Sequence, residues 1–231
     1  MTVLEPDLQT TVGPDAPSHD CPLCPRLVAF RTDNQAEHPD WFNAPVPTFG
    51  TRDASLLIVG LAPGLRGANR TGRPFTGVYA GDLLYATLLD YGFATGRYAQ
   101  RPDDGLTLID CAITNAVRCV PPQNKPLPEE IANCRRFLTA TIATMPNLRA
   151  IVALGRIAHD SLVRAAGEKL SAWPFAHGRA HRLAKLGARN VELFDSYHCS
   201  RYNTNTGVLT VEMFQALFAR VQEFLRTSHS S

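Results

Sequence analysis

The feature that most constrains this chain is an apolar run that stops abruptly in a long glycine-rich segment. Residues 56–59 read Leu-Leu-Ile-Val, Gly60 ends the run, and the next segment that fits a helix begins at Leu83. Such a run predicts a buried strand, and open α/β sheets bind ligands in the loops at the carboxyl ends of their strands. Glycine lets the backbone approach a ligand closely or take a positive φ. The glycine spacing is not that of a dinucleotide or phosphate-loop fingerprint, so a mobile surface loop is an equally good interpretation of this segment alone.

The same segment carries three arginines. Arg66, Arg70 and Arg73 would give the loop a cationic rim suited to phosphate groups. The net charge of +2 permits a nucleic-acid partner without demanding one, so any DNA-binding surface should be local. A second basic group, which we also expect to contact DNA, follows at Arg179, His181, Arg182, Lys185 and Arg189. Solvated side chains are the alternative interpretation of both groups.

Apolar runs that fit buried strands alternate along the chain with segments that fit helices. The expected strands cover residues 56–60, 106–114, 150–154 and 191–194. The expected helices cover residues 26–37, 83–89, 129–144, 156–166 and 211–225. This alternation predicts an α/β fold: a single-domain, three-layer α/β/α sandwich around a mainly parallel sheet of roughly four strands. Residues 1–20 are polar and contain three prolines, which predicts a poorly ordered lead-in to a domain at 21–231.

Length and cysteine content narrow the class of protein. A chain of 231 residues can bury a full core as one domain. No segment is apolar and long enough to cross a membrane, and the first twenty residues lack the pattern of a signal peptide, so we expect a cytoplasmic protein. In a reducing compartment the six cysteines are more typical of ligands or buried thiols than of disulfides. Cys21 and Cys24 form a Cys-x-x-Cys pair, whose thiolates can share a metal ion or a cluster.

Polar residues also follow the second and fourth expected strands. Asn115 directly follows the second strand, and His198 opens a polar loop after the fourth. Because the carboxyl ends of parallel strands meet at one edge of the sheet, these loops and the glycine-rich one should build a single cleft. An asparagine there can donate to one atom of a ligand and accept from another, although a turn-forming role is the alternative. A lone histidine is usually structural.

Three motifs at these loops resemble those of the uracil-DNA glycosylase superfamily, and most of all its family 5, the iron–sulfur-containing type B enzymes. The motifs are Gly60-Leu61-Ala62-Pro63-Gly64, the run from Asn69 to Gly77 (Asn-Arg-Thr-Gly-Arg-Pro-Phe-Thr-Gly), and His198-Cys199-Ser200 with Asn203 and Thr206-Gly207. The resemblance extends from Cys21 to the last expected helix. It implies a DNA repair enzyme, active as a monomer, that flips uracil out of DNA and hydrolyses its N-glycosidic bond. Other deaminated bases are further substrates that it implies.

The resemblance assigns roles to individual residues. Phe75 would stack under the flipped base, and Asn115 would read uracil O4 and N3–H, a pattern that cytosine cannot match. His198 would donate to uracil O2 as negative charge develops on the leaving base. Gly60, Ala62 and the position of Val78 would line the same pocket. Arg201 and Tyr202 lie where relatives insert a loop into the minor groove, while Arg66, Arg70 and Arg73 would contact phosphates.

Four cysteines agree with the same resemblance. Cys119, followed by prolines and a polar insert, and Cys134, in an expected helix, would join Cys21 and Cys24 to hold a [4Fe–4S] cluster. The role of the cluster would be structural, tying the amino-terminal segment to the proline-rich loop. Zinc accepts four cysteines equally well, so the spacing alone leaves both groups open. Cys111 and Cys199 are left over and should be buried thiols.

One position departs from the family pattern. Family 5 usually carries aspartate directly after Phe-Thr-Gly and alanine at the position of Ala62, and this chain has Val78 instead of the aspartate. Valine can neither take a proton nor hold a water by a hydrogen bond. Three explanations compete: an altered or inactivated enzyme, substitution by Asp82 or Asn69 as the water-positioning group, or catalysis by leaving-group stabilisation alone.

The hypothesis we favour from these residues is a weakened uracil-DNA glycosylase. A non-catalytic binder of damaged or abasic DNA on the same scaffold is the alternative. Val78 favours the alternative, whereas the presence of Phe75, Asn115 and His198 argues mildly against it. An unrelated iron–sulfur α/β protein acting on nucleotides is a third hypothesis, which the agreement of three motifs makes hard to sustain.

Overall fold

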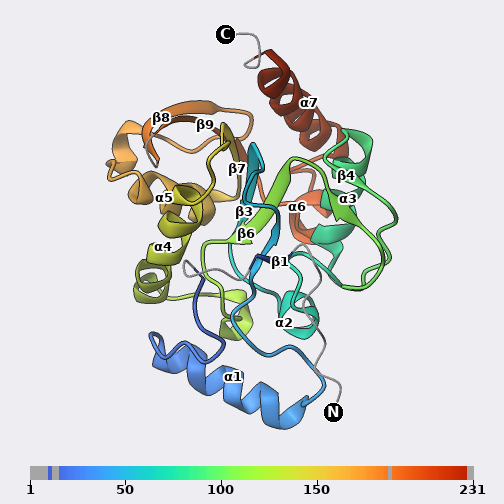
Figure 1. Cartoon of the computed structure of the whole chain (residues 1–231), viewed down its shortest axis with the longest axis vertical. Helices are drawn as coiled ribbons and strands as arrows, with labels where there is room; N and C mark the ends of the chain where they lie inside the picture. Colours follow the sequence, from blue (N-terminus) through green and yellow to red (C-terminus); the bar gives the residue numbers. More distant parts are fainter. Residues whose placement is uncertain (1–9, 12–15, 187–188, 228–231) are drawn as a thin grey trace.

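The computed structural model describes residues 10–11, 16–186 and 189–227. Its main sheet has seven strands in the order β1-β2-β6-β3-β7-β9-β8 (Figure 1). These strands are β1 (Thr10–Thr11), β2 (Thr48–Gly50), β3 (Leu56–Gly60), β6 (Cys111–Asn115), β7 (Ala150–Leu154), β8 (Ala180–Leu186) and β9 (Arg189–Ser196). Two further strands, β4 (Ala94–Thr95) and β5 (Thr107–Leu108), pair in a separate small sheet.

The centre of the main sheet is parallel, as predicted. Strands β6, β3, β7 and β9 run in one direction, while β2 and β8 pair antiparallel at the two sides and β1 adds to β2. The prediction of a mainly parallel α/β sheet is therefore confirmed, although seven strands replace the expected four. The three missed strands lie outside the parallel core and lack the continuous apolar runs of strands buried on both faces.

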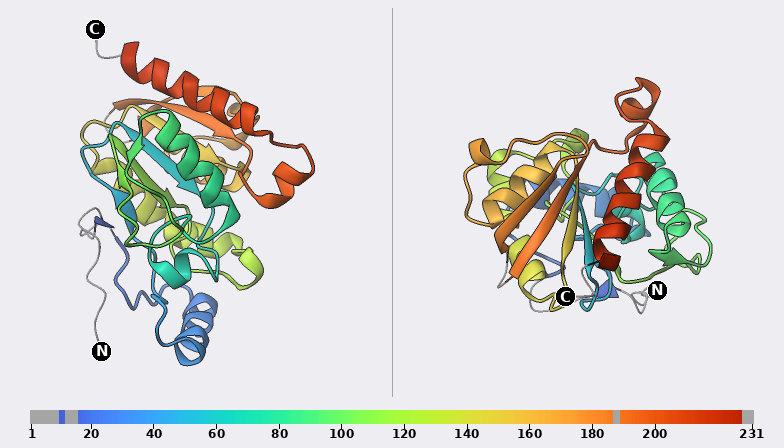
Figure 2. Two further views of the ribbon diagram at one scale, coloured as in Figure 1. Left: turned by 90° about the vertical axis from the view of Figure 1, so that its right-hand side faces the viewer. Right: turned by 90° about the horizontal axis from the view of Figure 1, so that it is seen from above.

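Helices cover both faces of this sheet, which confirms the three-layer arrangement. The helices are α1 (Pro25–Glu37), α2 (Ala68–Thr71), α3 (Tyr79–Asp90), α4 (Pro128–Ala143), α5 (Arg156–Ala165), α6 (Arg201–Asn205) and α7 (Val211–Thr227), with 3₁₀ turns at Pro122–Asn124 and Leu170–Ala172. Figure 2 shows α3 and α7 on one side of the strands and α4 and α5 on the other. Leu56 and Ile58 pack in the core that includes α3 and α7, and Leu57 and Val59 in the core that includes α4 and α5. This alternation is what a strand requires, because successive side chains point to opposite faces.

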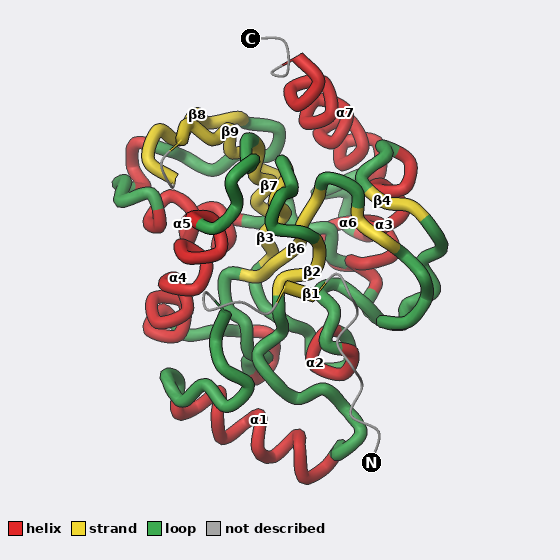
Figure 3. The backbone as a smooth tube through the Cα atoms, in the orientation of Figure 1, coloured by secondary structure: helices red, strands yellow, loops and turns green. Residues whose placement is uncertain are grey.

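Helix α1 lies beyond one end of the sandwich (Figures 1 and 3). Leu27 packs there in a small third core with Val117 and Cys134. Arg26 donates two hydrogen bonds to Glu130, at 2.8 and 2.7 Å, and Glu130 also accepts from the Leu127 N–H at 2.7 Å. The Glu130 carboxylate therefore links the start of α1, which follows Cys24, to the start of α4, which contains Cys134.

The second predicted strand is divided in two. A bend at Ile109 and Asp110 separates β5, which pairs with β4, from β6 in the main sheet. Asp110 has a φ of 48°, a conformation that aspartate tolerates better than most residues. Its carboxylate accepts hydrogen bonds from the N–H and the hydroxyl of Ser55, which precedes β3. The apolar periodicity continues through this bend, so the sequence pattern did not reveal it.

Two other segments differ from expectation. The basic segment around His181 forms the edge strand β8, in which His181 and Leu183 are buried while Arg182 and Ala184 are exposed. The predicted polar loop after β9 contains the short helix α6. Of the predicted lead-in, residues 1–9 and 12–15 lie outside the described residues. No helix within the described part of the chain is long and apolar enough to span a membrane.

Candidate active site

The carboxyl ends of β3 and β6 meet at Gly60 and Asn115, which are register partners. A Cβ atom at Gly60 would lie 2.5 Å from Asn115 Oδ1 and 2.6 Å from Cζ of Phe75. Only glycine avoids that overlap without displacing one of the two side chains. The missing side chain of Gly60 therefore allows the Asn115 amide and the Phe75 ring to meet at the end of β3.

The backbone of Phe75 is held in an unusual conformation. Its φ is 58°, which is strained for an aromatic residue and persists only where the surroundings enforce it. Tyr98 Oη donates to the Phe75 carbonyl at 3.3 Å, and a Cβ at Gly81 would lie only 1.8 Å from that carbonyl oxygen. Helix α3 and Tyr98 thus fix the Phe75 backbone, while its ring lies with the His198 ring at a centroid distance of 6.1 Å and an angle of 28°.

Asn115 offers unused hydrogen-bonding capacity. It is only 3% exposed, and its side chain forms no hydrogen bond with any other described residue. Its amide oxygen and nitrogen are not among the buried side-chain atoms without a partner, so they reach the surface, where one can accept from a ligand and the other can donate to it.

His198 lies two residues beyond β9, across the site from Asn115 on the sheet. Asn203 Nδ2 donates to the His198 carbonyl at 2.8 Å, and a Cβ at Gly155 would lie 3.5 Å from His198 Cβ. Burial lowers the pKa of His198, because the charged imidazolium loses solvation. The ring is therefore neutral at pH 7 and carries one N–H donor.

Val78 is the N-cap residue of α3. Its side chain makes no cap hydrogen bond, and a Cβ at Gly67 would lie 2.4 Å from Val78 Cγ1. The valine methyl therefore packs directly on the glycine-rich loop, where aspartate would both cap the helix and face the loop backbone.

The two suggested substitutes for the missing carboxylate differ in position. Asn69 is fully buried, and its Nδ2 donates to Asn43 Oδ1 at 2.8 Å. Its Oδ1 finds no partner among the described residues. Asp82 is half-buried in the first turn of α3, four residues after Val78 and therefore on the same side of the helix, and it accepts from Gln100 Nε2 at 2.7 Å. Asp82 remains the better placed of the two.

The three loop arginines separate into two kinds. Arg66 and Arg70 are exposed, as a phosphate contact requires. Arg73 is 3% exposed and forms a bidentate pair with Asp104, with N–O distances of 2.9 and 2.8 Å, while its guanidinium lies 5.2 Å from the centre of the Phe49 ring. Burial opposes ionisation of Asp104, but hydrogen bonds from Arg73, Ala99 and Leu106 lower its pKa to about 2. The prediction that Arg73 binds DNA is therefore wrong, because a buried, paired guanidinium cannot reach a phosphate.

The second basic group is also divided. His181 is buried and bonded to Asp195 Oδ2 at 3.0 Å, so the predicted DNA contact at His181 is wrong. Arg179 and Arg182 are exposed. The side chains of Lys185 and Arg189 lie outside the described part of the structure.

Helix α6 carries the two residues expected to enter the minor groove. Ser200 caps it by accepting from the Asn203 N–H at 3.3 Å. The Arg201 guanidinium lies 5.2 Å from the centre of the Tyr79 ring, and Thr204 Oγ1 donates to Tyr79 Oη at 3.1 Å, so α6 is docked against the start of α3. Tyr202 is 74% exposed.

The four cysteines named for a cluster line one pocket, together with Leu27, Val117 and Asn133 among others. Polar hydrogens point at three of the sulfurs: Arg118 N–H at 3.2 Å from Cys134 Sγ, Asn133 Nδ2 at 3.8 Å from Cys24 Sγ, and Arg31 Nη1 at 3.8 Å from Cys119 Sγ. Burial raises the pKa of Cys119 to about 12 and that of Cys134 to about 11. Such thiols stay protonated unless a cationic group binds them.

Two further cysteines, Cys111 and Cys199, and the motif residue Ala62 also have defined positions. Cys111 and Cys199 are buried elsewhere, which confirms that prediction. Ala62 is half-buried and packs, like Cys24 and Cys119, against the third core of Leu27, Val117 and Cys134.

Sequence reasoning missed the supports of the site. Asn43, Tyr98 and Asp104 hold Asn69, Phe75 and Arg73 respectively, from loops whose pairings carry no local sequence signal. Gly81 was also missed, although a glycine in the first turn of a helix is itself a sign of close backbone contact.

Residues 47–222 of the chain match the family described as the uracil DNA glycosylase superfamily. A Type-5 uracil-DNA glycosylase of Thermus thermophilus is 46% identical over 200 residues, covering 84% of this chain and 89% of the relative. A Type-5 uracil-DNA glycosylase of Pyrobaculum aerophilum is 37% identical over 206 residues, covering 87% of each chain. A Type-4 uracil-DNA glycosylase of Archaeoglobus fulgidus is 32% identical over 155 residues, covering 66% of this chain and 69% of the relative. The family match spans the three motif loops described above.

Proposed function

The chain belongs to the uracil-DNA glycosylase superfamily, and on that premise we propose that it flips uracil out of DNA and hydrolyses the N-glycosidic bond between base and sugar. The observation that carries this proposal is that the Asn115 amide and the Phe75 ring meet at the bare backbone of Gly60, with the His198 ring 6.1 Å from the Phe75 ring. A base removed from the helix needs a stacking surface and groups that read its edge, and this arrangement offers both.

Each of the three side chains has a distinct role in the proposal. The flipped base stacks on Phe75. Asn115 donates to uracil O4 and accepts from N3–H, so cytosine would place a donor against a donor. His198, neutral at pH 7, donates its N–H to uracil O2 as the glycosidic bond breaks and negative charge develops on the base. A donor that is already oriented toward that charge commonly contributes about 3–4 kcal/mol of transition-state stabilisation.

The step for which this chain supplies the fewest groups is activation of the attacking water. Val78 supplies neither a base nor a hydrogen-bond acceptor, and general-base help is typically worth about 10²–10⁴-fold in rate. We therefore propose a slowed glycosylase, in which leaving-group stabilisation carries most of the catalysis and Asp82 is the nearest remaining carboxylate in α3. Hypoxanthine and xanthine remain proposed further substrates.

We also propose that Cys21, Cys24, Cys119 and Cys134 hold a [4Fe–4S] cluster. Four zinc-bound sulfurs at about 2.3 Å from the ion would lie about 3.8 Å apart. Among the described residues, no three cysteine sulfurs lie within 4.8 Å of one another, so they are not arranged as a single zinc ion requires. The three polar contacts to sulfur suit a cluster too, because its thiolates carry net negative charge. When bound, the cluster would brace α1, α4 and the Cys119 loop.

DNA would lie over the exposed Arg66 and Arg70, with Arg201 and Tyr202 of α6 at the minor groove. We further propose that the protein is a monomer, that its domain covers residues 21–231 and that it is cytoplasmic. Non-catalytic binding of damaged or abasic DNA is the second candidate function, and Val78 is the observation that favours it.

The experiment that separates the two candidates uses one uracil-containing duplex with the protein in excess. Retained complex and abasic product are scored in the same samples over time, with a cytosine-containing duplex as control. A glycosylase converts the uracil strand to abasic product, whereas a binder retains the duplex unchanged. Equal retention of both duplexes without product would contradict both functions.

A further inference from the structure

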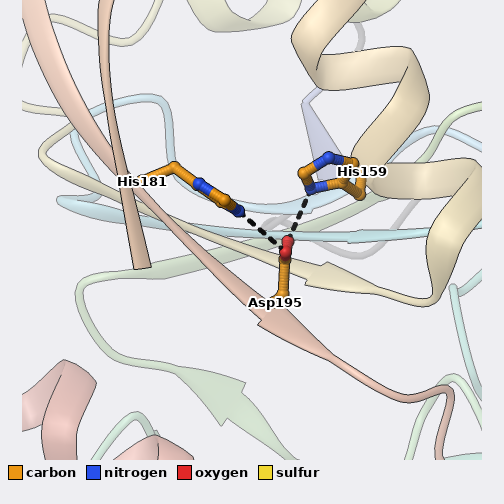
Figure 4. Close-up of side chains that lie close together, drawn as sticks. All are labelled: His159, His181 and Asp195. Carbon is orange, nitrogen blue, oxygen red and sulfur yellow. Dashed lines mark hydrogen bonds and ion pairs between the residues drawn. The ribbon is translucent and has the colours of Figure 1, made fainter. Parts of the chain in front are cut away.

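A buried histidine outside the cleft has an oxygen atom against each of its ring nitrogens. His159 Nδ1 lies 2.7 Å from Asp195 Oδ1, and His159 Nε2 lies 2.8 Å from the Trp173 carbonyl oxygen (Figure 4 shows the first contact). A carbonyl oxygen can only accept, so Nε2 must carry a proton. A neutral imidazole has no second proton for Nδ1. Unless a further cation lies between Nδ1 and Asp195, the short contact requires an additional proton.

The surroundings of Asp195 place that proton on His159. The carboxylate also faces His181 Nε2 at 3.0 Å and the Ala176 N–H at 3.4 Å, so a nitrogen lies within hydrogen-bonding distance of each of its two oxygens. His159 and Asp195 are fully buried, and His181 is 7% exposed. Burial alone would lower the pKa of His159, but the hydrogen bond and the charge of Asp195 outweigh it and raise the pKa.

Few other charges act on this pair. Asp160, the next residue on α5, adds a small attraction for the imidazolium. The ring of Phe175 packs edge-on to His159 at 5.6 Å, and the Arg156 guanidinium lies on that same ring, 5.3 Å from its centre. His177, in the segment before β8, interacts electrostatically with Asp195. Its Nδ1, however, accepts a hydrogen bond from the Tyr197 N–H. His159 and Asp195 are therefore the pair that holds the extra proton.

The pair joins the two elements that support His198. Asp195 lies near the end of β9, three residues before His198, and His159 lies in the first turn of α5. The backbone N–H of His159 donates to the Gly155 carbonyl at 3.1 Å. The backbone N–H of Gly155 in turn donates to the Ser196 carbonyl at 2.8 Å. Gly155 in turn is the residue whose missing Cβ would contact His198 Cβ. The ion pair therefore locks α5 and β9 together directly beside His198.

We propose that the buried His159–Asp195 ion pair is a positioning element for His198, and that loss of the His159 proton at alkaline pH releases it. This inference rests on the proposed glycosylase function of the cleft. Without the proton, Nδ1 and Oδ1 would face each other as two acceptors, and one of the two elements would have to move. His159 and Asp195 touch no substrate in this account, and they act only through the position of His198.

The test begins with the parent protein and needs no variant. Histidine ring NMR from pH 6 to 10 should show both nitrogens of His159 protonated at pH 7. The His198 ring signals should shift with the same midpoint as the His159 titration, because one movement links them. A neutral His159 at pH 7, or His198 signals indifferent to its titration, would overturn the proposal. So would stoichiometric zinc in the purified protein that is bound by His159, because a metal ion would then replace the proton.

Kinetics supply the second arm. With enzyme in excess over a uracil duplex, the parent rate should fall at alkaline pH with the His159 midpoint. Asp195→Asn should slow uracil release at pH 8 at least tenfold and move the alkaline limb to lower pH, while the Kd for DNA changes less than twofold. Asp160→Asn removes an equal charge one residue from His159 and should keep the parent profile. Equal profiles for Asp195→Asn and Asp160→Asn would mean that the pair is merely structural. A parent without any uracil release would refute the proposed function, while the NMR titration would still decide on the ion pair and its link to His198.

Discussion

Gly60 lies so close to Asn115 that a single added methyl group would come within 2.5 Å of the amide oxygen. The same methyl would meet the Phe75 ring at 2.6 Å. This one backbone position therefore sets the spacing between the group that reads the base edge and the surface on which the base stacks.

Replacing Gly60 by alanine should disable the site without unfolding the protein. Displacing a reacting group by about 1 Å can cost about 100-fold in rate, so Gly60→Ala should slow uracil release by at least that factor. Gly64→Ala is the matched control, because its methyl would lie 3.6 Å from Val78 Cγ1, an ordinary contact. Single-turnover rates and thermal unfolding of both variants give the answer. Similar rates for the two variants would show that close packing at Gly60 is not needed.

Arg70 and Arg73 should differ in their effects on DNA binding and stability, because Arg70 is exposed and Arg73 is buried. Arg70→Gln should reduce the slope of log K against log salt by about 0.9, the value of one phosphate contact. Arg73→Gln should instead lower the free energy of unfolding by about 3–5 kcal/mol, because Asp104 would remain buried without its partner. Salt titrations of DNA binding and denaturant unfolding measure the two effects. A reduced salt slope in folded Arg73→Gln protein would restore Arg73 to the DNA interface.

The pH dependence of His198 follows from its burial. Its pKa lies below the ordinary 6.5, so the ring stays neutral at pH values where a free histidine would be half charged. Because the unfolded chain binds this proton more readily, the contribution of His198 to stability falls as the pH drops below about 6.5. NMR titration of the ring measures the pKa directly. A midpoint at or above 6.5 would contradict a neutral donor in a desolvated site.

The proposed cluster in the cysteine pocket predicts the colour of the purified protein. The purified protein should be brown and contain iron and sulfide, and Cys119→Ser should lose both the colour and part of the stability, since cluster binding and folding are coupled. Cys111→Ser is the control, because Cys111 is a buried cysteine outside the pocket. Iron and zinc analysis with visible absorption decides the matter. One zinc per chain with no iron would refute the cluster while leaving the glycosylase proposal intact.

Much of this arrangement could be predicted because it follows from local pattern. Continuous apolar runs identify the buried parallel strands, and the residues after them, Asn115 and His198, lie at one edge because parallel strands end together. The four cysteines could be grouped only through family resemblance, since Cys21 and Cys134 are joined by tertiary structure alone.

The errors came from residues whose environment depends on distant partners. Arg73 is as charged as Arg70 in sequence, but Asp104, thirty-one residues away, draws it into the core. His181 occurs among basic residues, yet strand alternation and Asp195 place it inside. Nothing near Asn69 in the chain reveals that Asn43 would bind its amide group. In each case the deciding contact is a long-range pairing without a spacing rule.

The most direct test of the central claim is the rate of uracil release by the parent protein, Val78→Asp and His198→Ala, with each protein in excess over the same duplex. Val78→Asp restores an acceptor at the α3 N-cap and should raise the rate at least tenfold, equivalent to about 1.4 kcal/mol off the barrier, with little change in Kd. Val78→Thr offers a helix cap without a carboxylate and should stay near the parent rate. His198→Ala should be slower than the parent. Slow release by the parent with this order of rates is what the account predicts. Tight binding of the uracil duplex with no abasic product from the parent or from Val78→Asp would contradict it.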